Sequence, residues 1–196
     1  MKKPPFIGRI HELERLQGLF KQSKPKLVVV KGRRRIGKSR LISEFAARNQ
    51  KSKMWSFSGL APQEGMTAQS QRDHFARQFS ILSKIPPLTF QDWSDALDHL
   101  SSHIEEGDII LFDEISWMGN LDPTFMGKLK IFWDTEFSKN PKLILILCGS
   151  VSSWIEKNII SSTSFFGRIC QKIHLEELTL EESNLLLKSI QFRGST

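Results

Sequence analysis

Short apolar runs alternate with amphipathic stretches along this chain. The runs at 27–30, 108–114 and 142–150 are built mainly from Val, Ile, Leu and Phe, as is typical of strands buried on both faces. Residues 54–59 and 172–175 are more polar, and we expect strands there as well. Between the runs, apolar residues recur every three or four positions, which predicts helices at 10–22, 39–49, 68–84, 91–104, 123–138, 151–159 and 179–190.

This alternation of strands and helices predicts the fold class. A parallel pair of strands needs a long crossover connection, usually a helix, so alternating elements favour a parallel sheet covered on both faces. The chain has 196 residues, which suits one domain with a substantial core. We therefore predict an α/β fold of three layers.

Neither a membrane segment nor a secretory signal is expected. No stretch approaches the ~20 apolar residues of a membrane span. The first residues include lysines but no apolar segment before a cleavage site. Cys148 and Cys170 are the two cysteines of the sequence, and their spacing is not that of a metal site. We expect a cytoplasmic protein without disulfides.

Positive charge is concentrated in the first quarter of the chain. Residues 1–53 hold 16 lysines and arginines against 3 acidic residues, whereas residues 54–196 hold 12 against 18. The first segment therefore carries +13 and the second −6, which gives the net charge of +7. Such an asymmetry indicates an anionic partner for the first quarter, either a nucleotide or a nucleic acid.

The stretch GRRRIGKS at 32–39 carries the strongest chemical signal. Gly32, Gly37, Lys38 and Ser39 fill every fixed position of the pattern G-x-x-x-x-G-K-[ST], between a predicted strand and a predicted helix. In that pattern backbone N–H groups point at phosphates, the lysine reaches the β- and γ-phosphates and the serine holds magnesium. A glycine-rich turn without a ligand is the alternative. The candidate nucleotide-binding residues here are Gly32, Arg33, Arg34, Arg35, Ile36, Gly37, Lys38, Ser39 and Arg40.

Asp113 and Glu114 close the strand predicted at 108–114. In a P-loop fold an acid at the tip of a neighbouring strand contacts the magnesium, and a second carboxylate beside it can act as general base. Two acids at a strand end are, taken alone, more often merely solvated. Here they follow the glycine loop at a distance that leaves room for another strand and its helices. No glycine soon follows Asp113 and no Asn-Lys-x-Asp occurs, which argues against a GTPase.

Two further residues are candidates for sensing or stabilising the γ-phosphate. Ser150 ends the strand at 142–150, where a small polar side chain would lie between the acids and the γ-phosphate; an ordinary helix N-cap is an equal alternative. Arg168 follows Phe166-Gly167 in the loop before the last strand, and an arginine can stabilise transition-state charge. A surface arginine beside an apolar anchor explains it equally well.

Taken in order, these motifs resemble a known family. Phe6-x-Gly8-Arg9-x-x-Glu12 precedes the glycine loop. After the loop come, in order and at familiar distances, the strand DIILFDE, the strand LILILCGS and Phe166-Gly167-Arg168. From Pro5 to about Leu187 the chain resembles the archaeal-type ATPase family, part of the STAND branch of AAA+-related P-loop ATPases. The Phe-x-Gly-Arg start and the arginine-rich loop narrow the resemblance to this family.

The resemblance implies a P-loop domain of the additive-strand (ASCE) type with the strand order 5-1-4-3-2, binding ATP and Mg²⁺. Two departures matter. The turn Leu175-Glu176-Glu177-Leu178 lacks the proline that the family usually has beside adenine, and the chain stops after about one lid helix. We expect a core at 1–178 and a truncated lid at 179–196. The implied site comprises Phe6, Ile7, Gly8 and Arg9 near adenine, Lys38 at phosphate, Ser39 and Asp113 at magnesium, Glu114 at water, Ser150 as sensor and Arg168 at a matching family position.

We therefore expect an ATPase domain of a STAND-like molecular switch that binds Mg-ATP, hydrolyses it slowly and signals to a protein partner or effector region. Lys38, Glu114, Ser150 and Arg168 are the candidate catalytic residues. Two alternatives stay open. One is a nucleic-acid-binding module of origin-recognition-like type, in which the basic amino-terminal region contacts DNA. The other is a scaffolding domain with a degenerate nucleotide site.

Overall fold

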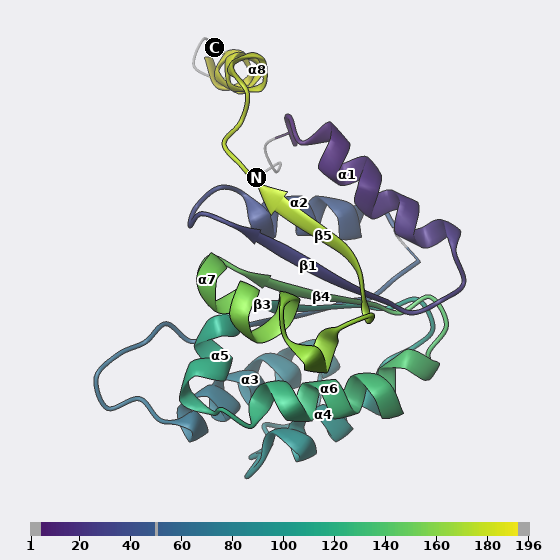
Figure 1. The fold of residues 1–196 in the computed structure, drawn as a ribbon, viewed down its shortest axis with the longest axis vertical. Coiled ribbons are helices and arrows are strands. Elements are labelled where there is room, and N and C mark those ends of the chain that lie inside the picture. Colours follow the sequence, from purple (N-terminus) through teal and green to yellow (C-terminus); the bar gives the residue numbers. More distant parts are fainter. Residues whose placement is uncertain (1–4, 50, 192–196) are drawn as a thin grey trace.

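One parallel sheet forms the centre of the molecule in the computed structural model, which describes residues 5–49 and 51–191 (Figure 1). Its strands lie in the order β2-β3-β4-β1-β5, and every neighbouring pair is parallel. The predicted α/β class and the strand order 5-1-4-3-2 are confirmed. The strands are β1 (Lys26–Gly32), β2 (Met54–Ser58), β3 (Ile109–Asp113), β4 (Ile144–Gly149) and β5 (Ile169–Leu175).

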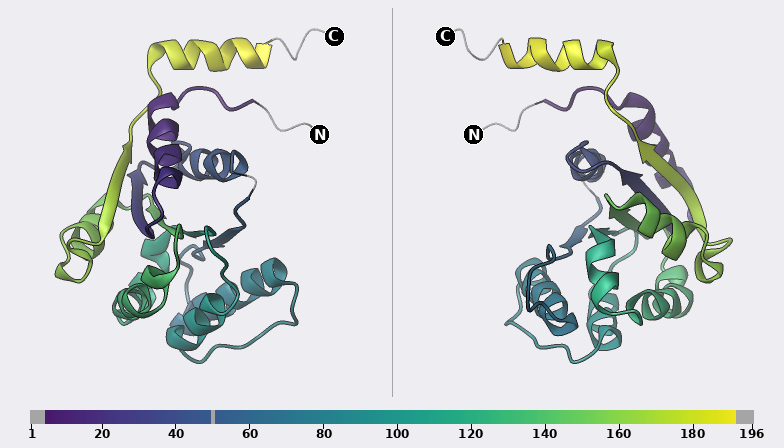
Figure 2. Two further views of the ribbon diagram at one scale, coloured as in Figure 1. Left: turned by 90° about the vertical axis from the view of Figure 1, so that its right-hand side faces the viewer. Right: turned by 60° about the vertical axis from the view of Figure 1, so that its left-hand side comes forward.

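Helices cover both faces of this sheet. In Figure 1, α1 and α2 lie on one face and α3 to α6 on the other, while α8 stands beyond the end of β5 and away from the sheet, as both views of Figure 2 show. Among the described helices, none is both long and apolar enough to cross a membrane. The helices are α1 (Ile10–Gln17), α2 (Lys38–Ala47), α3 (Ala68–Ser83), α4 (Trp93–Ser101), α5 (Ile115–Leu121), α6 (Phe125–Thr135), α7 (Ser152–Ile155) and α8 (Leu180–Gln191).

The alternation of side chains along β1 divides the core in two. Leu27 and Val29 pack into the aromatic-rich core beneath α3 to α6, whereas Val28 and Val30 pack against α1 and α2. All four side chains are fully buried. Because both faces are covered, the central strands have no polar face, which explains their uninterrupted apolar sequence.

The structure departs from the predicted elements in three places. The apolar pattern does not predict α5, a seven-residue helix that starts directly after Glu114. The helix expected at 151–159 is α-helical only over α7 and continues as a π-helix at Glu156–Ile160. β5 begins at Ile169, before the expected residue 172. In this edge strand buried residues occur only near the end, so the first residues carry no clear apolar signal. The expected lid at 179–196 is described as α8 up to Gln191, and residues 192–196 lie outside the described part.

Candidate functional site

The carboxyl ends of β3, β4 and β1 bring the predicted motifs together. These three strands are neighbours in the sheet and run in the same direction, so the residues that follow them meet at one edge. The glycine loop follows β1, Asp113 ends β3 with Glu114 directly after it, and Ser150 follows β4. Ligands of open parallel sheets bind at this edge.

The glycine loop holds Lys38 in a fixed position. Gly37 adopts φ 99° and leads into α2, whose first residue is Lys38. A Cβ atom on Gly32 would lie 2.5 Å from the backbone oxygen of Leu175, so the close approach of β1 and β5 requires glycine. The Lys38 side chain is buried, and its ammonium donates to the carbonyls of Gly32 at 3.0 Å and Arg33 at 2.9 Å. An ammonium has three N–H donors, so it can bind a phosphate oxygen while keeping both bonds.

Ser39 and Asp113 meet next to this lysine. The Ser39 hydroxyl donates to the Asp113 carboxylate across 2.6 Å, although the two residues lie 74 positions apart in the sequence. The other carboxylate oxygen of Asp113 accepts the backbone N–H of Glu114 at 3.0 Å, which fixes its orientation. A hydroxyl and a carboxylate are hard oxygen ligands, the kind that Mg²⁺ takes alongside phosphate oxygens. The residues present therefore fit the expected magnesium ion.

Glu114 lies in a sharp turn and is held by Ser150. Its backbone has φ 49° and ψ 45°, a left-handed conformation that is uncommon for residues other than glycine and that leads from β3 into α5. One oxygen of its carboxylate, Oε2, accepts the Ser150 hydroxyl at 2.8 Å and the Ser150 backbone N–H at 3.1 Å. The general base expected from the sequence and the expected sensor are thus directly connected.

Two residues that the sequence reasoning does not assign also shape this site. A Cβ atom on Gly59, just after β2, would lie 2.7 Å from the backbone oxygen of Glu114, so only glycine leaves space for this turn. Cys148 is buried in β4, and burial, followed by the nearby charge of Asp113, holds the pKa of its thiol well above its usual range. The thiol stays protonated beside Asp113. The signal in the sequence that could have identified Cys148 is its position two residues before the candidate sensor Ser150.

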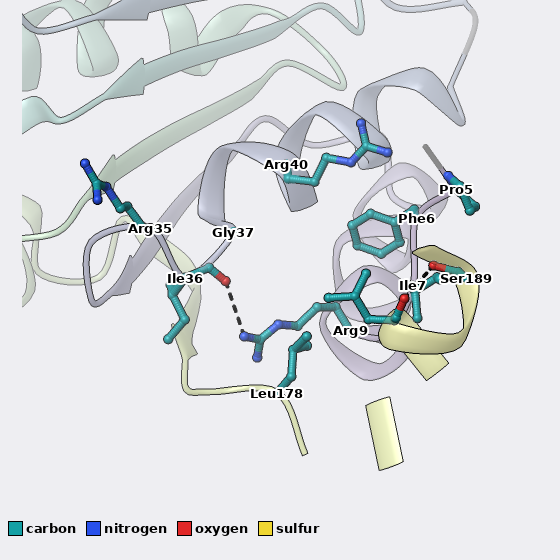
Figure 3. Close-up of a pocket in the computed structure, with 11 residues that line it drawn as sticks. Pro5, Phe6, Ile7, Arg9, Arg35, Ile36, Gly37, Arg40, Leu178 and Ser189 are labelled. Atoms are coloured by element: carbon teal, nitrogen blue, oxygen red, sulfur yellow. Dashed lines mark hydrogen bonds between the residues drawn. The ribbon is translucent and has the colours of Figure 1, made fainter. Parts of the chain in front are cut away.

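A cavity of about 540 Å³ adjoins the glycine loop (Figure 3). Phe6, Ile7 and Arg9 line it from the amino-terminal segment, and the close-up shows the Phe6 ring facing the space between the start of α2 and α8. The cavity is large enough for a nucleoside, and apolar and aromatic side chains with a few polar groups are typical of such sites. Its remaining lining comes from the amino-terminal segment, the glycine loop, the start of α2 and the carboxyl-terminal segment: Pro5, Arg35, Ile36, Gly37, Arg40, Leu178, Leu186 and Ser189.

Arg9 ties together the elements around this cavity. Its guanidinium donates to the carbonyls of Ile36 in the glycine loop, at 3.4 Å, and of Glu176 after β5. It also pairs with Glu12 at 3.3 Å. These contacts hold the Arg9 side chain in place, and the pairing with Glu12 neutralises its charge.

Glu182 of α8 connects this helix to the amino-terminal segment. One of its carboxylate oxygens accepts the backbone N–H of Arg9 at 2.7 Å, and the other accepts the backbone N–H of Thr179 at 2.9 Å. Gly8 packs against the same carboxylate, because a Cβ atom there would lie 3.0 Å from Glu182 Oε1. The Thr179-x-x-Glu182 spacing predicts the helix cap, but the contact with Arg9 crosses the whole sequence and has no local signal.

The loop arginines lie outside the phosphate cradle. Arg33, Arg34 and Arg35 are exposed. Arg33 pairs with Glu177 at 2.8 Å, and the Arg34 guanidinium lies over the Trp117 ring, 5.6 Å from its centre. Arg35 borders the cavity, but its guanidinium points away from Phe6 and Arg9 in Figure 3, whereas that of Arg40 lies on the cavity side.

The structure places Arg168, another expected site residue, at a distance from the glycine loop. It precedes β5 and therefore lies at the amino edge of the sheet, opposite the glycine loop. Its guanidinium makes two contacts with Asp134 of α6, Nε–Oδ1 at 2.7 Å and Nη2–Oδ2 at 2.9 Å. Hydrogen bonding to Arg168, with help from Lys130, lowers the pKa of Asp134 to about 2. The described chain does not bring Arg168 together with its own phosphate site.

Comparison with known proteins agrees with this geometry. Residues 6–191 match the model of a family described as an ATPase domain predominantly from Archaea. Comparison with curated protein sequences gave no significant match.

Three solved structures illustrate the shared fold. The ORC2 protein of Aeropyrum pernix, solved in ADPNP–ADP complexes, matches 96% of this chain and 53% of its own, with a TM-score of 0.64 and 14% identity. The Walker-type ATPase PABY2304 of Pyrococcus abyssi matches 96% and 59%, with a TM-score of 0.63 and 20% identity. The RuvB Holliday junction branch migration motor of Thermotoga maritima matches 94% and 50%, with a TM-score of 0.55 and 13% identity. The chain spans between about half and three fifths of the length of these proteins.

Proposed function

Since the chain belongs to the family of ATPase domains found predominantly in Archaea, we propose that it binds Mg-ATP at the carboxyl edge of its sheet and hydrolyses it slowly. The observation that carries this proposal is that Lys38 and Ser39, which follow β1, lie at the same edge of the sheet as Asp113 and Glu114 at the end of β3, with Ser39 bonded to Asp113. A structural turn would need none of these four groups together.

In the proposed complex, the loop amides and Lys38 hold the β- and γ-phosphates. The buried ammonium supplies a positive charge that is fixed before binding by its bonds to Gly32 and Arg33, so little reorganisation is needed. The base and ribose occupy the cavity beside Phe6. The cavity is closed by α8 on one side and by the glycine loop on the other.

Ser39 and Asp113 are the proposed magnesium ligands. When bound, the ion supplies neutralisation of charge on the phosphate oxygens. The short Ser39–Asp113 hydrogen bond keeps both oxygens directed to one point, and the Glu114 N–H limits rotation of the Asp113 carboxylate.

Glu114 is the proposed base that orients the attacking water. Ser150 occupies Oε2 with two hydrogen bonds, and Oε1 is left to accept a proton from water. Ser150 therefore positions the base, and its place after β4 lets it respond to events at the γ-phosphate. Through such a response, we propose, the domain acts as a STAND-like switch whose ATP and ADP states differ for a protein partner.

Two variants separate binding from hydrolysis. Titration of Mg-ATP, ADP and GTP against intrinsic tryptophan fluorescence is expected to show adenine preference. Trp117, three residues after Glu114, is the expected reporter of binding. Lys38→Ala should abolish this signal, whereas Lys139→Ala, an exposed lysine at the opposite edge, should not. Glu114→Gln should retain binding but lower phosphate release about a hundredfold or more.

The outcomes distinguish the rival functions. A parent chain that binds no nucleotide would favour a scaffolding domain with a degenerate site. Equal phosphate release by the parent and Glu114→Gln would show that another group activates the water. Glu181→Gln, on the exposed side of α8, is the matched control for the change in charge.

A further inference from the structure

The guanidinium groups of three consecutive arginines in the glycine loop are not used by the proposed ATP site, although Arg35 borders its cavity. The backbone of the loop and Lys38 form the phosphate cradle, and Arg33, Arg34 and Arg35 project from its outer side. Together with Arg9 they line a second hollow of about 610 Å³, which adjoins the ATP cavity and has Glu177 as its acidic neighbour. Because Arg9 is paired with Glu12, the excess of positive charge in this hollow comes from the three loop arginines against Glu177.

The arginines are spread across the edge of the sheet rather than gathered around one point. Arg33 extends toward Glu177 beyond β5, and Arg34 extends toward Trp117 on α5, the helix that follows β3. β5 and β3 are separated by β1 and β4 in the sheet, so at ~4.8 Å between strands the cations span roughly 14 Å. A row of this width suits an extended polyanion better than a single phosphate.

All three guanidinium groups are available to such a partner. The Arg33–Glu177 pair has side chains 81% and 74% exposed, and an ion pair that open to water contributes little and exchanges readily. Arg34 lies on the Trp117 ring, which fixes its plane while its N–H groups remain free at the edge. Arg35 has no ion pair or hydrogen bond among the described residues, and it points away from the cavity in Figure 3.

We propose that Arg33, Arg34 and Arg35 form a binding surface for the phosphate backbone of a nucleic-acid strand, next to the ATP cavity. The planar guanidinium fork matches the oxygens of a phosphate, and a strand presents phosphates in a row. The +13 charge of residues 1–53 attracts such a strand from a distance. Binding is independent of base sequence, because the contacts are to phosphate.

Fluorescence anisotropy of a labelled 20-nucleotide oligothymidylate tests this surface. Three phosphate contacts to a single strand predict a slope of about −2 for log K against log salt, or a loss of about twentyfold in affinity between 50 and 200 mM salt. R33Q/R34Q/R35Q should remove most of the binding and flatten this slope. K21Q/K24Q/K139Q, which removes three exposed cations from the opposite edge, should keep the slope of the parent.

Four results would overturn the proposal. Equal losses in the two triple variants would show that only the net charge matters. Displacement of the oligonucleotide by polyglutamate at an equal concentration of charges would favour an acidic protein. Displacement by saturating Mg-ATP would assign the arginines to the nucleotide, and an absence of salt-dependent binding by the parent would remove the surface altogether. Should the triple variant fail to fold by circular dichroism, Arg35→Glu alone provides the same test.

Discussion

The Glu182 carboxylate holds α8 against the cavity proposed for the nucleotide, and its removal should open the cavity from that side. It accepts the Arg9 backbone N–H at 2.7 Å, the Thr179 backbone N–H at 2.9 Å and the Thr179 hydroxyl at 3.2 Å. The first bond joins α8 to the amino-terminal segment, and the other two cap the helix. Glu182→Ala removes all three without touching the phosphate cradle.

The magnitude follows from these contacts. Loss of the Glu182 half of the capping box costs about 1 kcal/mol, while the Thr179 hydroxyl keeps its bond to the backbone N–H of residue 182. Loss of a charge-assisted hydrogen bond in a half-buried position costs about 1.5 kcal/mol. The docking of α8 should therefore weaken by about 2.5 kcal/mol, which corresponds to about sixtyfold in its opening equilibrium. Global stability should change little, because the two cores contain no residue of α8.

Hydrogen–deuterium exchange followed by mass spectrometry measures this opening directly. The amides of 183–189 should lose about sixtyfold in protection in Glu182→Ala, while those of β1 and β4 keep their protection. Nucleotide affinity should fall as well, because Leu186 and Ser189 of α8 line the cavity. Glu181→Ala is the matched control, since this neighbouring carboxylate is exposed and makes no hydrogen bond among the described residues.

Equal protection of α8 in Glu182→Ala and Glu181→Ala would refute this reasoning. It would mean that apolar contacts alone hold the helix. The direction in which the stability of α8 changes with pH offers an independent check. Backbone hydrogen bonds from Thr179 and Arg9 lower the pKa of Glu182, so the stabilisation is complete above the ordinary carboxyl range and is lost as the pH falls through the lowered value. The protection factors of the α8 amides, corrected for the intrinsic exchange rate at each pH, should therefore fall on acidification in the parent and not in the variant.

Three further predictions concern stability. Asp108→Ala should destabilise the fold by about 3 kcal/mol in urea unfolding, because its buried carboxylate accepts the Trp55 indole N–H at 2.9 Å and two backbone N–H groups; an effect below 1 kcal/mol would contradict this. The pKa of Asp134 is about 2, held there by Arg168, so the melting temperature of the parent should fall more steeply than that of Asp134→Asn between about pH 4 and pH 2; parallel curves would exclude a contribution from this pair. Gly32→Ala should lower both the melting temperature and nucleotide binding, because its Cβ meets a backbone oxygen of β5 at 2.5 Å; an unchanged melting temperature would show that the strands can separate freely.

The predictable part of the fold is the part in which burial is uniform. β1 and β4 are buried on both faces, so their apolar runs identify them without ambiguity. α5 is short and begins at a left-handed residue that its own sequence does not announce, since Glu114 is held there by Ser150 and by the space that Gly59 leaves. Tertiary contacts of this kind override local propensity, and a single sequence does not display them.

The candidate site divides in the same way. Lys38 and Ser39 are found from a motif because backbone geometry at a phosphate demands fixed residue types at fixed spacing. The hydrogen bond between Glu182 and Arg9 joins residues 173 positions apart. Its donor is a backbone N–H, which nearly every residue type has, so the sequence at position 9 does not indicate this bond. Contacts of a side chain with a distant backbone are invisible to motif reasoning for this reason.

The placement of Arg168 shows which additional inference the sequence permits. In a parallel sheet all strands run in one direction, so a residue that follows a strand lies at the carboxyl edge and a residue that precedes one lies at the amino edge. Asp113, Glu114 and Ser150 end or follow their strands, whereas Arg168 precedes β5. The seven residues of β5 then separate it from the glycine loop by roughly 23 Å at ~3.3 Å per residue. The order of motifs along the chain is therefore insufficient to assign Arg168 to the phosphate site. The position of each motif before or after its strand decides which motifs share a site.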